Sequence, residues 1–308
     1  MINKFKNIFI LTILTTLLIF FIINPSIVIK SITENINFFI YKIFPSLFFF
    51  FLMADLLLAF NFITILKRLF ALPTKKLFHL DKNSSFILFM SLFSGFPSGS
   101  KYISTLLKKK MISIECANTL IIYTHFSNIA FILGTIGSFL NKRMTLIILI
   151  SHFLSNLIIA SIVRPKNITK EKKVDKQLPT SFTDVLSTSI ISNIKIIIII
   201  FGTMIFFSTM SLMFSHILPL NNYQNVLLCG LLDLSSGIIS LSNLNISLFY
   251  KGLLSLTFIS FGSLSVHMQV RILIKNTEIK YSYFLLGRIS QVAISISIYL
   301  LLLYWCLY

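Results

Sequence analysis

Long apolar segments separated by short, mostly basic loops make up most of this chain of 308 residues. Runs of about 18 or more nearly uncharged apolar residues are typical of helices that cross a bilayer. Seven segments fit this description: residues 8–24, 38–60, 113–140, 146–163, 196–214, 253–270 and 281–303. With 56% hydrophobic residues overall, the chain leaves no room for a large soluble domain. The pattern predicts an all-α polytopic membrane protein.

Two further apolar segments, residues 84–107 and 226–242, are interrupted by small and polar residues. The first contains Leu92 to Lys101 (LFSGFPSGSK), where glycine and proline should break a helix. The second contains Leu232 to Gly237 (LDLSSG). In hydrocarbon a broken helix is tolerated only where protein or a water-filled cavity covers the freed peptide groups. We therefore expect two re-entrant helical hairpins, whose breaks line a site.

The basic residues indicate an orientation, since Lys and Arg number 27 against 9 Asp and Glu. With seven crossings and a cytosolic N-terminus, most of them fall in inner loops, as the positive-inside rule requires, and the C-terminus lies outside. Residues 61–83, broken by Pro73, alternate apolar and basic side chains and predict an amphipathic helix on the membrane surface. No basic helix interleaved with aromatic residues appears, which argues against a nucleic-acid binder.

The two halves of the chain share one plan: a span, a proline, a Ser-Gly break and a span with a polar centre. An odd number of crossings separates them, so the second unit is expected to be inverted, as in many transporters. The predicted units are an N-terminal span with an outer loop (1–35), a first repeat (36–163), a basic cytosolic linker (164–183) and a second repeat with the C-terminal span (184–308).

Polar residues of the breaks and of two spans form the candidate site. Helix N-termini at a break present unpaired N–H groups, and hydroxyls and amides orient a polar solute without the cost of burying a charge. Asp233 would have a cation or proton as its partner. The candidate substrate-binding residues are Ser94, Gly95, Pro97, Ser98, Gly99, Ser127, Asn128, Asp233, Ser236, Gly237, Ser263, Ser265, His267 and Gln269.

Simpler roles compete at several positions. The serines also suit helix–helix packing. For His267, a hydrogen bond to a neighbouring helix backbone is the simpler alternative to a proton relay. Asp55, in the second span, is either functional or a group near a helix end that reaches water or a partner. The cysteines and histidines lack metal-ligand spacing, so neither a metal nor another cofactor is expected.

The motifs do not favour an enzyme. Ser98 to Lys101 fits the S-x-x-K motif of serine acylases, but the companion S-D-N and K-T-G motifs are absent. An intramembrane serine hydrolase that uses Ser98 with His125 or His267 is a weaker alternative, because no G-x-S-x-G turn is present. No phosphate-binding loop of the form G-x-x-x-x-G-K-[ST] occurs, so an ATP-driven pump would need a partner.

Four stretches resemble the sporulation integral membrane protein YlbJ family, over roughly residues 38–275. They are Ser94 to Lys101 (SGFPSGSK), Ile112 to Asn128 (ISIECANTLIIYTHFSN), Phe131 to Gly137 (FILGTIG) and Phe261 to Val270 (FGSLSVHMQV). The resemblance implies a Gate or nucleoside-recognition domain, shared with concentrative nucleoside transporters and the ferrous-iron permease. It implies an inner-membrane protein needed for spore maturation and cortex formation, which moves a small solute such as a nucleoside-like molecule.

Two departures from the family change the candidate site. Ile129 stands where relatives carry a second Asn beside Asn128, and Ser100 stands where they carry alanine. The missing amide removes a donor and an acceptor. A structural membrane protein of sporulation that transports nothing remains the main alternative, because a family can keep its fold after losing an activity. The expected partners are the lipid bilayer, a small polar solute, a coupling cation or proton, and further copies of the chain.

Overall fold

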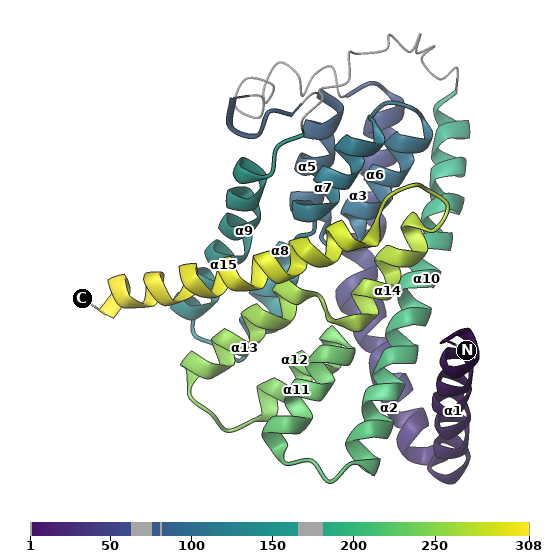
Figure 1. Cartoon of the computed structure of the whole chain (residues 1–308), viewed down its shortest axis with the longest axis vertical. Helices are drawn as coiled ribbons and strands as arrows, with labels where there is room; N and C mark the ends of the chain where they lie inside the picture. The colour runs from purple at the N-terminus through teal and green to yellow at the C-terminus, as the bar shows by residue number, and fades with distance from the viewer. Residues whose placement is uncertain (1, 63–75, 81, 166–180, 308) are drawn as a thin grey trace.

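The computed structural model describes residues 2–62, 76–80, 82–165 and 181–307, and within these ranges the regular structure is helical (Figure 1). Six helical segments of the described chain are long and apolar enough to span a membrane. They are Phe5–Ile23, Pro25–Ala59, Lys142–Ile162, Phe182–Ile217, Leu248–Ile274 and Tyr281–Trp305. The prediction of an all-α protein with several membrane spans is confirmed; a seventh span and the inverted repeat stay predictions.

The N-terminal part forms two antiparallel segments joined at Asn24. Helix α1 (Ile2–Ile23) is followed by α2 (Pro25–Phe38), a π-helical turn η1 (Phe39–Ile43) and α3 (Phe44–Ala59). Pro25 occupies the first turn of α2, where its missing N–H leaves no helical hydrogen bond unmade. An outer loop was predicted between the first span and residue 35. In the structure these residues are helical instead, and the helix continues from Pro25 into the second span.

The first broken segment is a pair of helices that pack against each other, α5 (Lys82–Ser94) and α6 (Ser98–Lys108). Gly95 lies at the break with φ of +73°, and a β-carbon there would approach Asn128 too closely. The expected helix break in this segment is confirmed. Most of residues 61–83, including Pro73, lies outside the described residues, as does most of the 164–183 linker.

The second broken segment is also a packed helix pair, α11 (Asn222–Leu232) and α12 (Leu234–Asn243). Asp233 is extended between them (φ −138°, ψ 130°) and caps the N-terminus of α12. The two helices approach so closely that a β-carbon on Gly237 would overlap Gly230. In Figure 1 this pair lies toward the bottom of the molecule, and the α5–α6 pair lies toward the top.

Both spans with polar centres are interrupted. Residues 113–140 do not form one long helix: α7 (Ile114–Tyr123) unwinds at 124–128, and the chain resumes as the short helix α8 (Ile129–Phe131) and the π-helical turn η2 (Ile132–Ile136). The other span divides into α13 (Leu248–Phe261) and α14 (Ser263–Ile274) at Gly262, which has a φ of +88°. The backbone N–H of Ser127 and the carbonyl of His125 thus bond to α9 instead of to their own helix.

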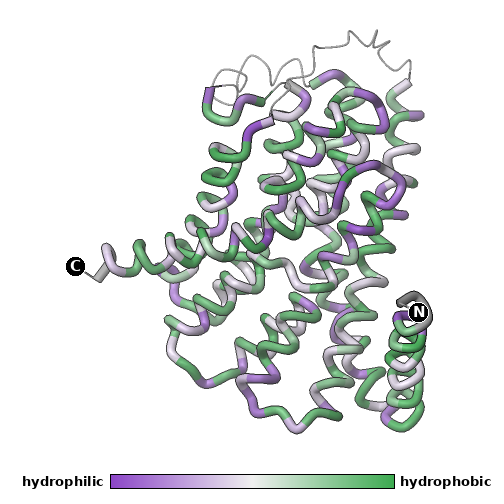
Figure 2. Tube along the Cα trace, viewed as in Figure 1, coloured by the Kyte–Doolittle hydropathy of each residue, from purple (hydrophilic) through white to green (hydrophobic). Residues whose placement is uncertain are grey.

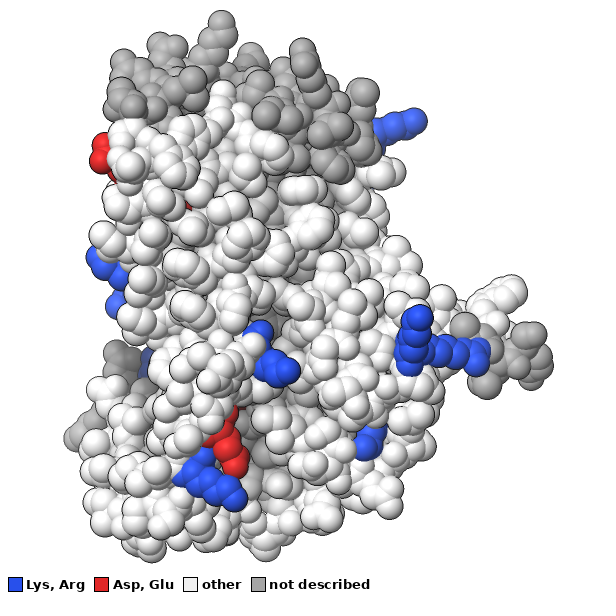
Figure 3. All heavy atoms as spheres, turned by 180° about the vertical axis from the view of Figure 1, so that it is seen from behind, with Lys and Arg blue, Asp and Glu red and all other residues white. Residues whose placement is uncertain are grey.

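Three long helices complete the bundle: α9 (Lys142–Ile162), α10 (Phe182–Ile217) and α15 (Tyr281–Leu307). Helix α15 packs against α7, α9 and α13, and α10 packs against α2, α3, α11 and α14. Most of α1 and much of α15 are themselves hydrophobic, as the green parts of the trace show in Figure 2. Much of the opposite face in Figure 3 carries no charged side chains, as a surface in contact with lipid tails requires.

Candidate functional site

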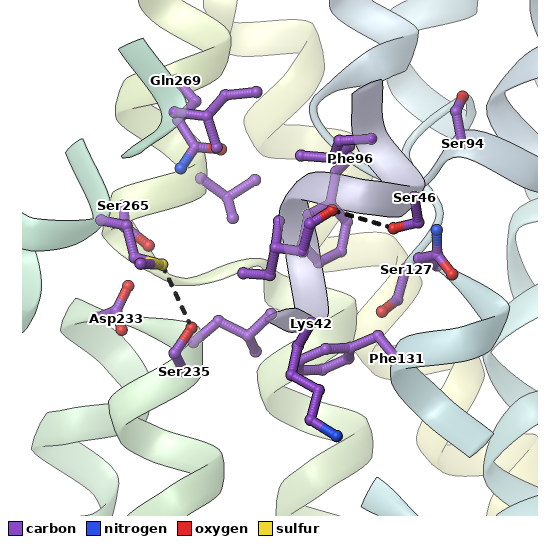
Figure 4. A pocket seen from close by; sticks show the side chains of 17 residues that line it. Lys42, Ser46, Ser94, Phe96, Ser127, Phe131, Asp233, Ser235, Ser265 and Gln269 are labelled. Carbon is purple, nitrogen blue, oxygen red and sulfur yellow. Dashed lines mark hydrogen bonds between the residues drawn. The ribbon is translucent and has the colours of Figure 1, made fainter. Parts of the chain in front are cut away.

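The two breaks meet at a cavity of about 80 Å³, called here the central cavity (Figure 4). Its walls come from both broken segments, the unwound residues 124–128, α10, α14 and the junction of η1 with α3. The lining residues are Lys42, Ile43, Ser46, Leu47, Ser94, Phe96, Ser127, Asn128, Phe131, Ile200, Met204, Asp233, Leu234, Ser235, Ser265, Val266 and Gln269. Because a cavity of about 10–15 Å³ holds one water, the central cavity has room for several waters or a small solute.

Six of the predicted site residues lie in the wall of the central cavity. They are Ser94, Ser127, Asn128, Asp233, Ser265 and Gln269. The other eight predicted residues do not line the cavity; several of them shape the helix breaks. The eight are Gly95, Pro97, Ser98, Gly99, Ser236, Gly237, Ser263 and His267. The structure therefore brings polar residues of both breaks and of both spans with polar centres to one cavity.

Three polar residues of the wall were missed. Ser235 lies two residues after Asp233 in the second break, and this position could have identified it. Lys42 and Ser46 flank a proline at the junction of η1 and α3, where no motif marked them. Ser46 Oγ donates to the carbonyl of Ile43 at 3.1 Å, so the hydroxyl stabilises the helical turn at that junction.

Asp233 is the acidic group of the cavity wall, and it is 1% exposed. Its Oδ2 accepts hydrogen bonds from the Ser236 backbone N–H at 3.0 Å and from the Ser236 hydroxyl at 3.1 Å. The carboxylate thereby satisfies an N–H group at the start of α12 and lies at the positive end of that helix dipole. No Lys, Arg or His of the described chain forms an ion pair with it.

Hydrogen bonds from α9 hold the unwound segment in place. His152 Nε2 accepts from the backbone N–H of Ser127 at 2.8 Å, which requires that nitrogen to be unprotonated. Asn156 Nδ2 donates to the carbonyl of His125 at 3.0 Å. These bonds replace the helical hydrogen bonds lost at 124–128, and they position Ser127 in the cavity wall.

The histidines considered as catalytic groups have other partners. His267 Nε2 lies 3.0 Å from the carbonyl of Phe261, at the end of the preceding helix, and Nδ1 lies 2.6 Å from the Tyr281 hydroxyl. The bond to the Phe261 carbonyl is the simpler alternative for His267, a hydrogen bond to the backbone of a neighbouring helix. His125 Nε2 lies 2.8 Å from Ser100 Oγ, while the Ser98 hydroxyl donates to the Gly95 carbonyl.

Two buried basic residues were not predicted as site residues. Lys101 forms an ion pair with Asp55 at 2.9 Å, which gives Asp55 the partner that the sequence left open. Arg288 on α15 is 1% exposed and donates only to carbonyl and amide oxygens. Neither residue lines the central cavity.

Comparison with known proteins adds one relative. Aligned over 307 residues, the chain is 24% identical to the sporulation integral membrane protein YlbJ of Bacillus subtilis (strain 168). The chain resembles YlbJ. The match to YlbJ covers 86% of this chain and 75% of that protein, which extends the resemblance beyond residues 38–275. It agrees with the six apolar spans in indicating a multi-pass membrane protein. No family model and no solved structure matches the chain.

Proposed function

We propose that this protein is a permease for a small polar solute in the cell inner membrane and that it acts in sporulation. The proposal rests chiefly on one observation: the two helix breaks meet at a cavity that contains a buried carboxylate without an ion-pair partner in the described chain. Two interrupted helices that meet at mid-membrane are the usual setting of a transporter binding site. The name of the relative, a sporulation integral membrane protein, supports the cellular role.

The wall of the central cavity suits a polar solute. Asn128 Nδ2 is buried without a hydrogen-bond partner, so this donor is available to a ligand. Pockets for drug-sized ligands measure about 300–1,000 Å³, several times the volume of this cavity. The conformation described here therefore fits a solute of a few heavy atoms, and a nucleoside-like molecule requires the walls to move apart.

Asp233 adds a charge requirement. A buried carboxylate with hydrogen bonds but no counter-ion carries a large desolvation cost, which a cation or a proton relieves. We infer that the solute carries a positive group or is accompanied by a cation or proton at Asp233. We also infer, from the distribution of basic residues, that the N-terminus is cytosolic and the C-terminus lies outside.

Uptake by vesicles that contain the purified full chain tests this function. A panel of radiolabelled nucleosides, amino acids and small amines is offered to wild type and to Asp233→Asn, which keeps the shape and removes the charge. Wild type is expected to take up at least one solute, and Asp233→Asn is expected to take it up at least about tenfold more slowly, equivalent to about 1.4 kcal/mol. Ser94→Leu, which fills the cavity wall, is expected to have the same effect.

Glu34→Gln is the matched control, because Glu34 is an exposed acid on α2 outside the cavity. It should leave uptake unchanged. Vesicles inert to the whole panel, with folded protein, would favour the non-transporting structural role. We propose that the protein is not an enzyme, since Ser98 and Ser100 are fully buried. Covalent labelling of either serine by a fluorophosphonate probe would contradict that.

A further inference from the structure

A buried ion pair connects three helices near the end of the molecule where α6 ends and α10 begins. Lys101 Nζ on α6 lies 2.9 Å from Asp55 Oδ1 on α3 and donates to Asn193 Oδ1 on α10 at 2.7 Å. The same ammonium lies 4.6 Å from the centre of the Phe51 ring. Lys101 is 5% exposed and the Asp55 side chain 19%. The contacts of one side chain thus hold α3, α6 and α10 together.

A second hollow of about 480 Å³, called here the basic-end hollow, adjoins this ion pair. Asp55, Lys101, Lys109 and Asp184 are among its lining residues. It lies where α6 ends at the Lys108–Lys110 run and where α10 begins at Phe182. This is the end of the molecule that we propose to be cytosolic.

The central cavity and the basic-end hollow lie along the same two helices. On α3, Leu47 lines the first and Asp55 the second, and the fully buried Phe51 lies between them at four-residue spacing on the same face. At 1.5 Å per residue, Leu47 and Asp55 are separated by about 12 Å along the helix axis. On α10, Ile196 lines the basic-end hollow, and Ile200, one turn later, lines the central cavity. Phe51 and the ion pair therefore occupy the interval between the two spaces.

We propose that Lys101, Asp55 and Asn193 form a latch that closes the central cavity toward the basic end, and that its opening joins the two spaces. This inference rests on the proposed transport function, because a permease needs a route from its site to each side of the membrane. An ion pair suits the task, since its attraction is strong while it is dry and falls when water reaches it. Asp55 already borders the hollow, so water reaches the pair from that side when the helices separate.

The latch is tested by the access of a reagent to the central cavity. Ser46→Cys, in the cavity wall, provides the reporter in a background with Cys116→Ala, Cys229→Ala and Cys306→Ala. A membrane-impermeant methanethiosulfonate ammonium reagent is added to inside-out vesicles, which expose the proposed cytosolic side, and the rate of labelling is measured without any solute.

Lys101→Met is expected to speed labelling at least about tenfold, because a buried carboxylate that loses its partner must be hydrated or exposed. Asp55→Asn is expected to act in the same direction with little change of shape. The double variant Lys101→Met/Asp55→Leu should return to the parent rate, since two apolar side chains close the same gap without charge. Lys251→Met is the matched control, because Lys251 Nζ bonds to the Ser242 carbonyl and lines neither space.

Labelling of Lys101→Met and Asp55→Asn at the parent rate, with folded protein, would overturn the latch. So would a double variant that is labelled as fast as Lys101→Met, because that result indicates loose packing instead of a closed contact. The labelling needs no transported solute. If uptake is absent while the single and double variants behave as expected, transport fails and the latch stands as a gate to the cavity; if uptake occurs and labelling does not respond, only the latch fails.

Discussion

Arg288→Met is expected to destabilise the fold by about 2–6 kcal/mol through the loss of hydrogen bonds to buried acceptors. The guanidinium is 1% exposed. It donates to the backbone carbonyls of Ile122 at 3.0 Å, His125 at 2.9 Å and Ser260 at 3.4 Å, and to the side-chain oxygen of Gln291. Ile122 and Ser260 lie in the last turns of α7 and α13. The positive charge therefore faces the negative ends of two helix dipoles.

The size of the expected loss of stability depends on which hydrogen-bond acceptors are left without a donor in Arg288→Met. The His125 carbonyl keeps its bond from Asn156, and the bond to Ser260 is long and weak. The Ile122 carbonyl and the Gln291 oxygen are left without a donor. Each buried unsatisfied group costs about 1–3 kcal/mol, which gives about 2–6 kcal/mol for the two. At about 2 °C per kcal/mol for a large domain, the expected fall in Tm is roughly 4–12 °C.

Thermal unfolding of the purified protein in detergent, followed by size-exclusion chromatography, measures this change. Arg271→Met is the matched control, because Arg271 is exposed and stacks on the Tyr281 ring at 4.9 Å; it should change stability by no more than about 1 kcal/mol. Arg288→Lys should lie between wild type and Arg288→Met, since a single ammonium does not reproduce the planar fork. An Arg288→Met variant that unfolds at the wild-type temperature would refute the reasoning, because the acceptors would then have other donors.

Two further variants probe the surroundings of the central cavity. Gly99→Ala should lower the free energy of unfolding by about 1–3 kcal/mol, because the added β-carbon overlaps the backbone carbonyl of Thr124. Gly134→Ala is the control and should leave stability unchanged, since nothing lies within 4 Å of its added carbon. Thermal unfolding compares the two variants. His152→Leu should leave the N–H of Ser127 unpaired and speed hydrogen–deuterium exchange in residues 124–128 about tenfold, with exchange elsewhere unchanged. Equal exchange in both proteins would show that the bond from Ser127 does not hold the segment.

The helix breaks were predictable because their signals are local. Gly95 and Pro97 disfavour helix whatever surrounds them, and Asp233 followed by serines is a typical helix start. Ser94 and Asp233 were identified on this basis, and Ser127, Asn128, Ser265 and Gln269 from the polar centres of two spans. The spans were predictable for the same reason, since length and hydropathy decide whether a helix can cross hydrocarbon.

Features that depend on distant partners could not be predicted. Residues 124–128 contain neither glycine nor proline. They unwind where His152 on α9 accepts from the Ser127 N–H and Asn156 donates to the His125 carbonyl. The pairing of Lys101 with Asp55 joins residues 46 positions apart, and no spacing rule connects them. The roles of Lys42 and Ser46 likewise depend on how η1 and α3 pack against the two breaks.

The buried charges of the described chain differ in how they are compensated, and this difference points to the site. Lys101 has a carboxylate, and Arg288 has carbonyl oxygens and two helix C-termini. Asp233 has hydrogen bonds from the start of α12 and from the Ser265 hydroxyl on α14, but no ion-pair partner in the described chain. Of the three, only Asp233 lines the central cavity. Because a buried charge without a counter-ion is costly, this difference supports the proposal that a solute or cation binds at Asp233.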